Sequence, residues 1–247
     1  MRLMRNVYQI SGGMYGSHQN VYVVDAGQEL ILIDSGKDSF DWDILYRNLR
    51  YWEIDHKPVS YVLLTHSHYE HSGNASRFEA FGATVVGHPL CVEAIKSGND
   101  RVAAYAFLDL PPYPVCMHPK AIDDMERIVV EGYEFQAIHC PGHSDDSMVY
   151  RVVVDGSVIL FTGDTVLNGD LCQESELGWT GAVDYDQETY IRSLTKLSNL
   201  QADFVLPGHG ELCLARGDRM LVGAFLRARL LLSTQPSVPV RFDDYFR

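Results

Sequence analysis

Four apolar segments of the chain each run directly into a short loop that holds histidine or aspartate. They are YVLLTHSHYEH from residue 61, FQAIHCPGHS from residue 135, VILFTGD from residue 158 and FVLPGHG from residue 204. Apolar runs of this length are typical of buried β-strands. Strand ends in α/β sheets deliver side chains to a common crevice. The recurrence therefore predicts an α/β fold whose strand ends share one polar site.

The first of these loops, HSHYEH, concentrates three histidines and a carboxylate within six positions. Imidazoles this close repel one another when protonated, and a divalent metal removes the repulsion by taking their lone pairs. A spacing of two places His66 and His68 on the same side of an extended segment, so both can reach one ion. Glu70 and His71 follow where the chain turns into a helix, and they can face a second ion.

The three later loops contribute His143, Asp164 and His209. Each alone is weak, because glycine before a polar residue is common turn chemistry. In this order, each at the end of an apolar run, and together with HSHYEH, they predict a metal centre.

This set resembles the metallo-β-lactamase superfamily, whose pattern is His-x-His-x-Asp-His, then a separate His, then Asp, then His. The resemblance covers nearly the whole chain and includes LILIDSG, GHP, the GD of FTGD and PGHG. It implies an α/β fold in four layers, an αβ/βα sandwich of two mixed β-sheets with helices outside. It also implies a ligand set: His66, His68 and His143 for a first metal, Glu70, His71 and His209 for a second, and Asp164 as the bridge.

Glu70 is a departure from the family pattern, which usually has aspartate at this position. Its extra methylene leaves two interpretations open. In the first, Glu70 ligates the second ion after a small movement of the loop. In the second, it overshoots the ion and acts as a base or a hydrogen-bond partner outside the ligand shell. The first is favoured, because the other second-site ligands are retained and need an anionic partner.

The resemblance implies a hydrolase in which a water bridging two metals loses a proton near neutral pH and attacks the substrate. The expected substrate is a small-molecule ester, lactone, thioester or amide, with Glu70 and Asp164 as catalytic carboxylates. The expected cofactors are two divalent ions, zinc first, with iron or manganese as alternatives. An iron-dependent oxidoreductase similar to the persulfide dioxygenases is the alternative function. A non-catalytic binding module is disfavoured by the complete ligand set.

Composition restricts the partners and the compartment. The formal net charge of −13 disfavours nucleic acid and anionic membranes, so a small-molecule substrate is expected, with a homodimer left open. The five scattered cysteines form no CxxC pair, which favours a reducing compartment. The first residues show no signal-peptide core, and no apolar stretch reaches the roughly 20 residues of a membrane span. We expect one cytoplasmic domain over residues 1–247.

Local patterns predict the elements around the site. Strands are expected at 7–10, 20–25, 29–34, 59–65, 84–87, 127–130, 133–138, 147–154, 158–161 and 203–206, and helices at 38–51, 74–81, 186–200 and 218–232. The aromatic and proline-rich segment Asn99–Met117, with Gly178–Tyr185, is predicted to form an apolar pocket wall that includes Tyr113 and Trp179; core or dimer packing is the alternative. The remaining histidines are predicted to be structural or surface residues: His18, His56, His88, His118 and His139.

Overall fold

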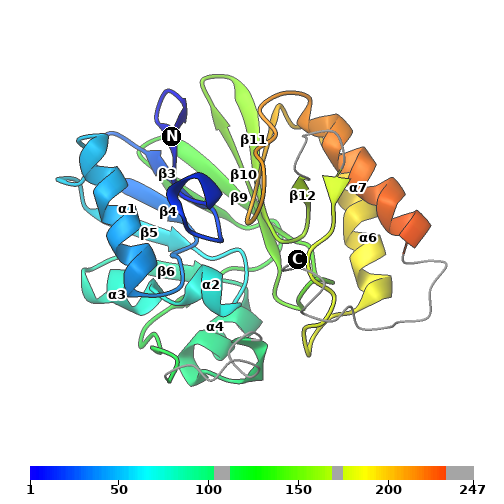
Figure 1. Cartoon of the computed structure of the whole chain (residues 1–247), viewed down its shortest axis with the longest axis horizontal. Coiled ribbons are helices and arrows are strands. Elements are labelled where there is room, and N and C mark those ends of the chain that lie inside the picture. The colour runs from blue at the N-terminus through cyan, green and yellow to red at the C-terminus, as the bar shows by residue number, and fades with distance from the viewer. Residues whose placement is uncertain (103–111, 169–174, 232–247) are drawn as a thin grey trace.

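The structure is a computed structural model that describes residues 1–102, 112–168 and 175–231 (Figure 1). Two β-sheets lie in the middle of the molecule, and helices lie on the outer side of each (Figure 1). Within the described ranges, no helix is long and apolar enough to cross a membrane.

The first sheet comes from the N-terminal half of the chain. Its strands follow one another in chain order: β1 (Arg2–Met4), β2 (Val7–Ser11), β3 (Val21–Asp25), β4 (Leu30–Ile33), β5 (Val59–Leu63), β6 (Thr84–Gly87) and β7 (Lys120–Ala121). Strands β1 to β4 pair antiparallel as a meander. From β4 to β7 the pairing is parallel, which requires crossover connections.

The second sheet has the order β14-β11-β10-β9-β8. Its strands are β8 (Arg127–Val130), β9 (Tyr133–His139), β10 (Met148–Val154), β11 (Ser157–Gly163) and β14 (Phe204–Pro207). Strand β14 pairs parallel with β11, and the other pairs are antiparallel. A short ladder of β12 (Leu167–Asn168) and β13 (Ser175–Glu176) follows β11 in the chain. Both large sheets are mixed, because each contains parallel and antiparallel pairs.

Helices supply the crossovers and the outer layers. They are α1 (Ser39–Tyr51), α2 (Tyr69–Ser72), α3 (Ala75–Ala80), α4 (Pro89–Ser97), α6 (Gln187–Leu197) and α7 (Gly217–Leu231), with 3₁₀ turns η1 (Gly13–Tyr15) and η2 (Asp100–Val102). Helix α1 begins after Asp38, whose carboxylate accepts hydrogen bonds from the backbone N–H groups of Phe40 and Asp41. This cap satisfies donors that have no partner inside the helix.

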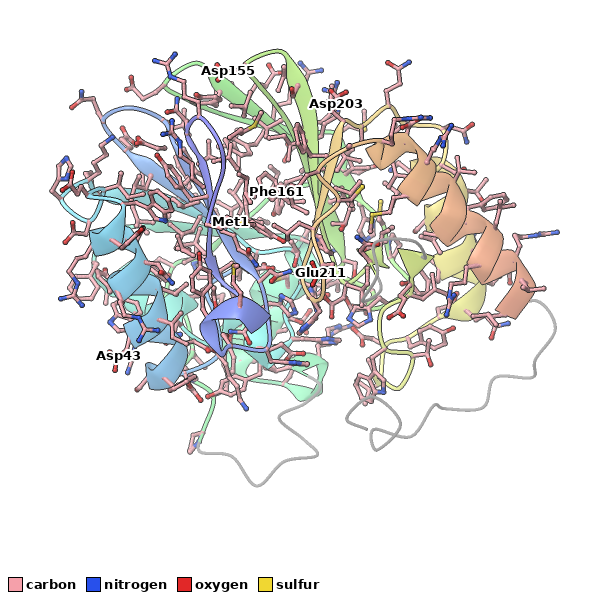
Figure 2. All side chains as sticks on the ribbon, turned by 45° about the horizontal axis from the view of Figure 1, so that its top comes forward. Met1, Asp43, Asp155, Phe161, Asp203 and Glu211 are labelled. Carbon is pink, nitrogen blue, oxygen red and sulfur yellow. The ribbon has the colours of Figure 1, made fainter. Side chains whose placement is uncertain are left out.

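Three apolar cores separate four layers. The middle core lies between the sheets and includes Tyr22, Tyr150 and Phe161. Figure 2 shows Phe161 in the interior of the molecule. A second core packs the outer face of the first sheet against α1, α3 and α4. A third packs the outer face of the second sheet against α6 and α7. The predicted four-layer αβ/βα sandwich with two mixed sheets is confirmed.

Most predicted elements are present with ends moved by a few residues, but helix α4 was not predicted. It begins at Pro89, behind His88, whose Nδ1 accepts a hydrogen bond from the backbone N–H of Leu90. Proline is favoured at the first position of a helix because it has no N–H to lose. The buried Ala94 and Ile95 then face the sheet.

The prediction that Tyr113 lines a pocket wall is wrong. Its side chain is buried in the core under the first sheet, and its hydroxyl donates a hydrogen bond to Oγ of Ser72 at 2.7 Å. Tyr105, Phe107 and Leu108, which belong to the segment 99–117 predicted to form that wall, lie outside the described residues.

The two sheets meet at the edge where their parallel strands end. Thr65 follows β5, and its carbonyl accepts a hydrogen bond from the N–H of Met148 at the start of β10 (2.7 Å). Gly163, the last residue of β11, packs against the side chain of the same Thr65. The loops after β5, β9, β11 and β14 are therefore brought to one edge.

We expect Phe161→Ala to destabilise the protein by about 3–5 kcal/mol, because it leaves a cavity between the two sheets. Phe81→Ala is the matched control, since that ring is 76% exposed and its removal should cost no more than about 0.5 kcal/mol. Urea unfolding followed by circular dichroism gives both values. Equal losses for the two variants would contradict the middle core.

Candidate functional site

Two groups of potential metal ligands lie at the common edge of the sheets. The first contains His66, His68 and His143, and the second contains Glu70, His71, Asp164 and His209. Within each group the ligand atoms all lie within 4.8 Å of one another. The structure thus brings together all seven residues that the sequence predicted, and their role as ligands stays a prediction.

The first group consists of three buried imidazoles. His66 and His68 follow β5, and His143 follows β9. Nε2 of His143 lies 3.1 Å from Nδ1 of His68. The Nε2 atoms of His66 and His68 are buried and have no hydrogen-bond partner among the described residues. A buried polar atom without a partner costs free energy, and a cation bound to Nε2 of His66 would satisfy that atom. The donor set therefore fits a metal ion.

Hydrogen-bond acceptors behind the rings determine which nitrogen faces each group. Three Nδ1 atoms have such a partner: His71 to Oδ2 of Asp34 (2.9 Å), His143 to the carbonyl of Trp179 (2.8 Å) and His209 to the carbonyl of His18 (3.1 Å). A neutral imidazole has only one N–H, so a ring that donates from Nδ1 presents a lone pair at Nε2. The Nε2 atoms of His71 and His209 lie 3.1 Å apart and face the second group.

Asp164 lies between the two groups. Its Oδ1 is 3.5 Å from Nε2 of His71, and its Oδ2 is 3.3 Å from Nε2 of His209 and 3.7 Å from Nε2 of His143. Burial raises the pKa of Asp164, but the fields of His209 and His71 outweigh it and hold the pKa well below its usual range. An ionised carboxylate thus contacts both groups, at the position that the resemblance assigned to a bridging ligand.

The protonation of the imidazoles differs between the two groups. Burial lowers the pKa of His68 to about 3 and places the pKa of His66 well below its ordinary value, and neighbouring histidines add to both shifts. These rings are therefore neutral, the form that binds a metal. In the second group burial also lowers the pKa values of His71 and His209, but Asp164 outweighs it and raises both above the ordinary value.

Glu70 belongs to the second group despite its extra methylene. It lies in α2, and one of its carboxylate oxygens is within 4.8 Å of the ligand atoms of His71, Asp164 and His209. Burial raises the pKa of Glu70, but His71 and His68 outweigh it and hold the pKa below its ordinary value. An anionic carboxylate therefore remains within reach of an ion in the second group.

Asp34 links the two groups from behind, and the sequence did not identify it as a functional residue. It accepts hydrogen bonds from Nδ1 of His71 (2.9 Å) and from the N–H (2.8 Å) and Oγ1 (2.9 Å) of Thr65. Oγ1 of Thr65 is also 3.0 Å from Nδ1 of His66. One buried carboxylate at the end of β4 thus orients a ring in each group. Its only sequence signal is its place at the end of an apolar strand, in LILIDSG.

Asp146 ties the loops of the first group together and was also missed. Its buried carboxylate accepts hydrogen bonds from the N–H of Ser67 (2.9 Å) and from Oγ of Ser144 (2.7 Å). Ser67 stands between His66 and His68, and Ser144 follows His143. The relative position of the three rings therefore depends on this carboxylate.

Two glycines allow the backbone to approach the second group closely. A Cβ at Gly208 would collide with Oδ1 of Asp164, and a Cβ at Gly178 would collide with the carbonyl of Asp164 and with Nδ1 of His143. The glycine before His209 in LPGHG is thus required by space, because the neighbouring atoms are backbone and a buried carboxylate.

His18 is a further residue of the site that its sequence position did not reveal. Its exposed ring packs against the ring of His209, with centroids 4.5 Å apart, and its carbonyl accepts the hydrogen bond from that histidine. The neighbours of His18 are buried and anchor the loop, since Ser17 and Gln19 both donate hydrogen bonds to the carboxylate of Asp41. His18 therefore lies at the open side of the second group.

The model of the metallo-beta-lactamase superfamily matches residues 14–209. The chain belongs to this superfamily. The resemblance predicted from the HSHYEH loop and the three later ligands is therefore confirmed.

Two curated relatives are named as thioesterases. The chain is 31% identical to an "Atrochrysone carboxyl ACP thioesterase" of Aspergillus fumigatus, over 84% of this chain and 57% of that protein. It is 29% identical to "Thioesterase pkgB" of Emericella nidulans, over 81% of this chain and 48% of that protein. The chain thus spans about half the length of these relatives.

Solved structures share the fold. A metallo-beta-lactamase of Cronobacter sakazakii with a HARLDQ motif superposes with a TM-score of 0.76 at 20% identity, covering 95% of this chain and 93% of that one. A protein described as the first B3 metallo-beta-lactamase with an active site glutamic acid superposes with a TM-score of 0.70 at 19% identity, covering 98% of this chain and 89% of that one.

We expect His66→Ala to lose the ion of the first group, because a site of three imidazoles cannot spare one ligand. His118→Ala is the control, since His118 is exposed and outside both groups. Metal content measured by mass spectrometry after dialysis should fall in the first variant and stay at the parent value in the second. Full metal content in His66→Ala would overturn the assignment.

Proposed function

We propose that this protein is a hydrolase that cleaves thioesters with two divalent metal ions, and that zinc is the preferred metal. The observation that carries the proposal is the pair of ligand groups joined by one ionised carboxylate, Asp164, which lies within 3.7 Å of nitrogens in both. The thioester class is supported by relatives that are named as thioesterases.

The metal assignment follows from the donor chemistry. Imidazole and carboxylate ligands suit zinc, with iron or manganese as alternatives. His66, His68 and His143 would hold the first ion, Glu70, His71 and His209 the second, and Asp164 would contact both. When bound, the ions supply a Lewis acid for the substrate carbonyl and lower the pKa of a water molecule.

The protein's own groups supply orientation and proton transfer. Asp34 and Asp146 hold the rings so that their lone pairs converge, which removes reorganisation from the reaction. Glu70, the anionic group on the partly exposed side of the second group, accepts the proton of the attacking water or holds that water in place.

The described residues favour hydrolysis over the iron-dependent oxidoreductase. That alternative requires the first group and Asp164, and it can leave the second site empty. Here Glu70, His71 and His209 complete a second group whose ligand atoms lie within 4.8 Å of one another. A complete second group has a use in hydrolysis and none in the alternative.

We expect the zinc-loaded protein to hydrolyse an acyl thioester faster than a lactone, a simple ester or a β-lactam with the same acyl portion. The carboxylic acid formed from each substrate is measured by chromatography, the thiol released from the thioester is measured with a colorimetric reagent, and chelation should abolish both. Preferential cleavage of the lactone or the β-lactam would contradict the substrate class. Oxygen uptake by the iron-loaded protein with a persulfide, without thioester cleavage, would contradict hydrolysis itself.

We expect Glu70→Gln to weaken the second ion far more than the first, because a neutral amide is a poorer ligand than a carboxylate. The loss should be at least about tenfold, since even outer-shell partners contribute about that much. Glu70→Asp is the matched control and should retain both ions. Titration of zinc into the stripped variants, with a competing chelator, measures each step. Two ions held as tightly in Glu70→Gln as in the parent would show that Glu70 is not a ligand.

A further inference from the structure

Two histidines outside the ligand groups stack on each other where the two sheets meet. His88 follows β6 of the first sheet, and His139 is the last residue of β9 of the second sheet. The centroids of their rings lie 4.0 Å apart, and the rings are nearly parallel, with an interplanar angle of 11°. Both residues are half-buried. We call these two residues the histidine pair, which links the two halves of the fold.

Backbone partners determine which nitrogen of each neutral ring carries the proton. Nδ1 of His88 accepts a hydrogen bond from the N–H of Leu90 at 3.3 Å and thereby caps helix α4. A nitrogen that accepts this bond carries no proton, so the proton of the neutral His88 ring is on Nε2. Nε2 of His139 lies 2.9 Å from the carbonyl of Asp145, and it donates there because a carbonyl only accepts. The cap of α4 therefore requires a neutral His88.

The ring of His139 also closes the loop that carries His143. Its hydrogen bond to the carbonyl of Asp145 spans that loop. The N–H of Cys140 donates to the carbonyl of Ser147 at 2.8 Å across the same turn. The position of the histidine pair is therefore coupled to a loop of the first ligand group.

A proton added to His88 is incompatible with this arrangement. A cationic imidazole carries a proton on each nitrogen, so Nδ1–H of His88 would face the N–H of Leu90. The ring then has to turn away from the start of the helix, and α4 loses its cap. A ring that has turned no longer lies parallel to the ring of His139, so the stack is lost with the cap.

The surroundings of His88 disfavour its charged form. Burial and the neighbouring His139 lower the pKa of His88 to about 4. Three aspartates act on this pKa in the opposite direction: Asp123, Asp124 and Asp145. Asp123 is exposed, and the surrounding water weakens its field.

The other two aspartates already have cationic partners. Asp124 pairs with Lys196 of α6 at 3.1 Å. Asp145 pairs with Arg101 of η2 at 3.0 Å, and Arg101 also lies 3.9 Å from Glu93 of α4. Their negative charge is partly neutralised by these cations, so the charged form of His88 gains little from them.

We propose that the histidine pair is a pH-sensitive contact that controls how firmly the loop of His143 is held. At neutral pH the neutral ring of His88 caps α4 and stacks on His139. On acidification His88 takes up a proton, α4 loses its cap, the rings separate, and the loop from His139 to Ser147 loosens. This response requires neither a bound metal nor a substrate.

The contribution of His88 to stability has a defined pH range. A histidine in the unfolded chain takes up a proton near pH 6.5, whereas the folded protein resists protonation of His88 down to about pH 4. Between these values the unfolded chain binds more protons than the folded protein. The contribution is therefore complete above about pH 6.5 and is lost as the pH falls from there to about 4.

Nuclear magnetic resonance of the full chain with ring-labelled histidine measures the titration directly, and His88→Asn identifies the signal of His88. Its midpoint should lie at least about one pH unit below the ordinary value of about 6.5. The amide signal of Leu90 should shift with the same midpoint, because this N–H loses its acceptor. A midpoint of His88 near the ordinary value, or an amide of Leu90 that does not respond, would overturn the proposal.

Hydrogen exchange measured by mass spectrometry tests the link to the loop. His88→Asn keeps a capping acceptor that does not titrate. After correction for the intrinsic pH dependence of exchange, the rate for residues 139–147 at about pH 4.5 should be at least about threefold lower in this variant than in the parent. At about pH 7.5 the two rates should agree.

His118→Asn is the matched control, because it makes the same substitution at an exposed histidine. Its exchange should follow that of the parent at both pH values. Equal loosening of residues 139–147 in the parent and in both variants would overturn the proposal.

Discussion

Asp34 accepts hydrogen bonds from Thr65 and His71 at the point where β4 and β5 end, and both ligand groups depend on them. A buried carboxylate is costly unless donors surround it, and here an N–H, a hydroxyl and an imidazole do so. Thr65 in turn lies 3.0 Å from His66. The alignment of two parallel strands is thereby converted into the orientation of one ring in each group. Without Asp34, the ligands would be present, but the rings of His71 and His66 would lose the hydrogen bonds that orient them.

Backbone carbonyls orient two further histidine rings in the same way, and one of these contacts joins the two sheets. Nδ1 of His143 donates a hydrogen bond to the carbonyl of Trp179. Nδ1 of His209 donates one to the carbonyl of His18, which lies in the first half of the chain. The ligands thus come from loops on both sheets, and their convergence requires that the middle core around Phe161 is packed. Ions bound between these loops would stabilise the folded state, because the unfolded chain has no preformed site. Folding and ligand geometry are therefore coupled through the sheet interface.

The sequence predicts the residues whose signal is local and misses those whose contacts are distant. HSHYEH and the strand ends before His143, Asp164 and His209 are visible as patterns within a few positions. The supporting contacts join residues 37 positions apart for Asp34 and His71, and 191 apart for His18 and His209. The acceptors for His143 and His209 are backbone carbonyls, which every residue type carries. Tyr113 shows the converse case, because an aromatic among prolines looks like a loop until tertiary packing buries it.

The two groups differ in charge, and in the proposed hydrolase this difference would reduce the effect of having glutamate instead of aspartate at position 70. The first group offers neutral imidazoles, whose pKa values burial lowers, while the second contains two carboxylates held ionised by neighbouring histidines. A cation in the second group is attracted by the whole anionic cluster, so its retention does not depend on the reach of one side chain. A cation in the first group would be held by three neutral imidazoles and would have Asp164 as its only nearby carboxylate among these seven residues. In the proposed hydrolase, the substrate carbonyl therefore belongs beside His66 and His68, and proton transfer belongs beside Glu70.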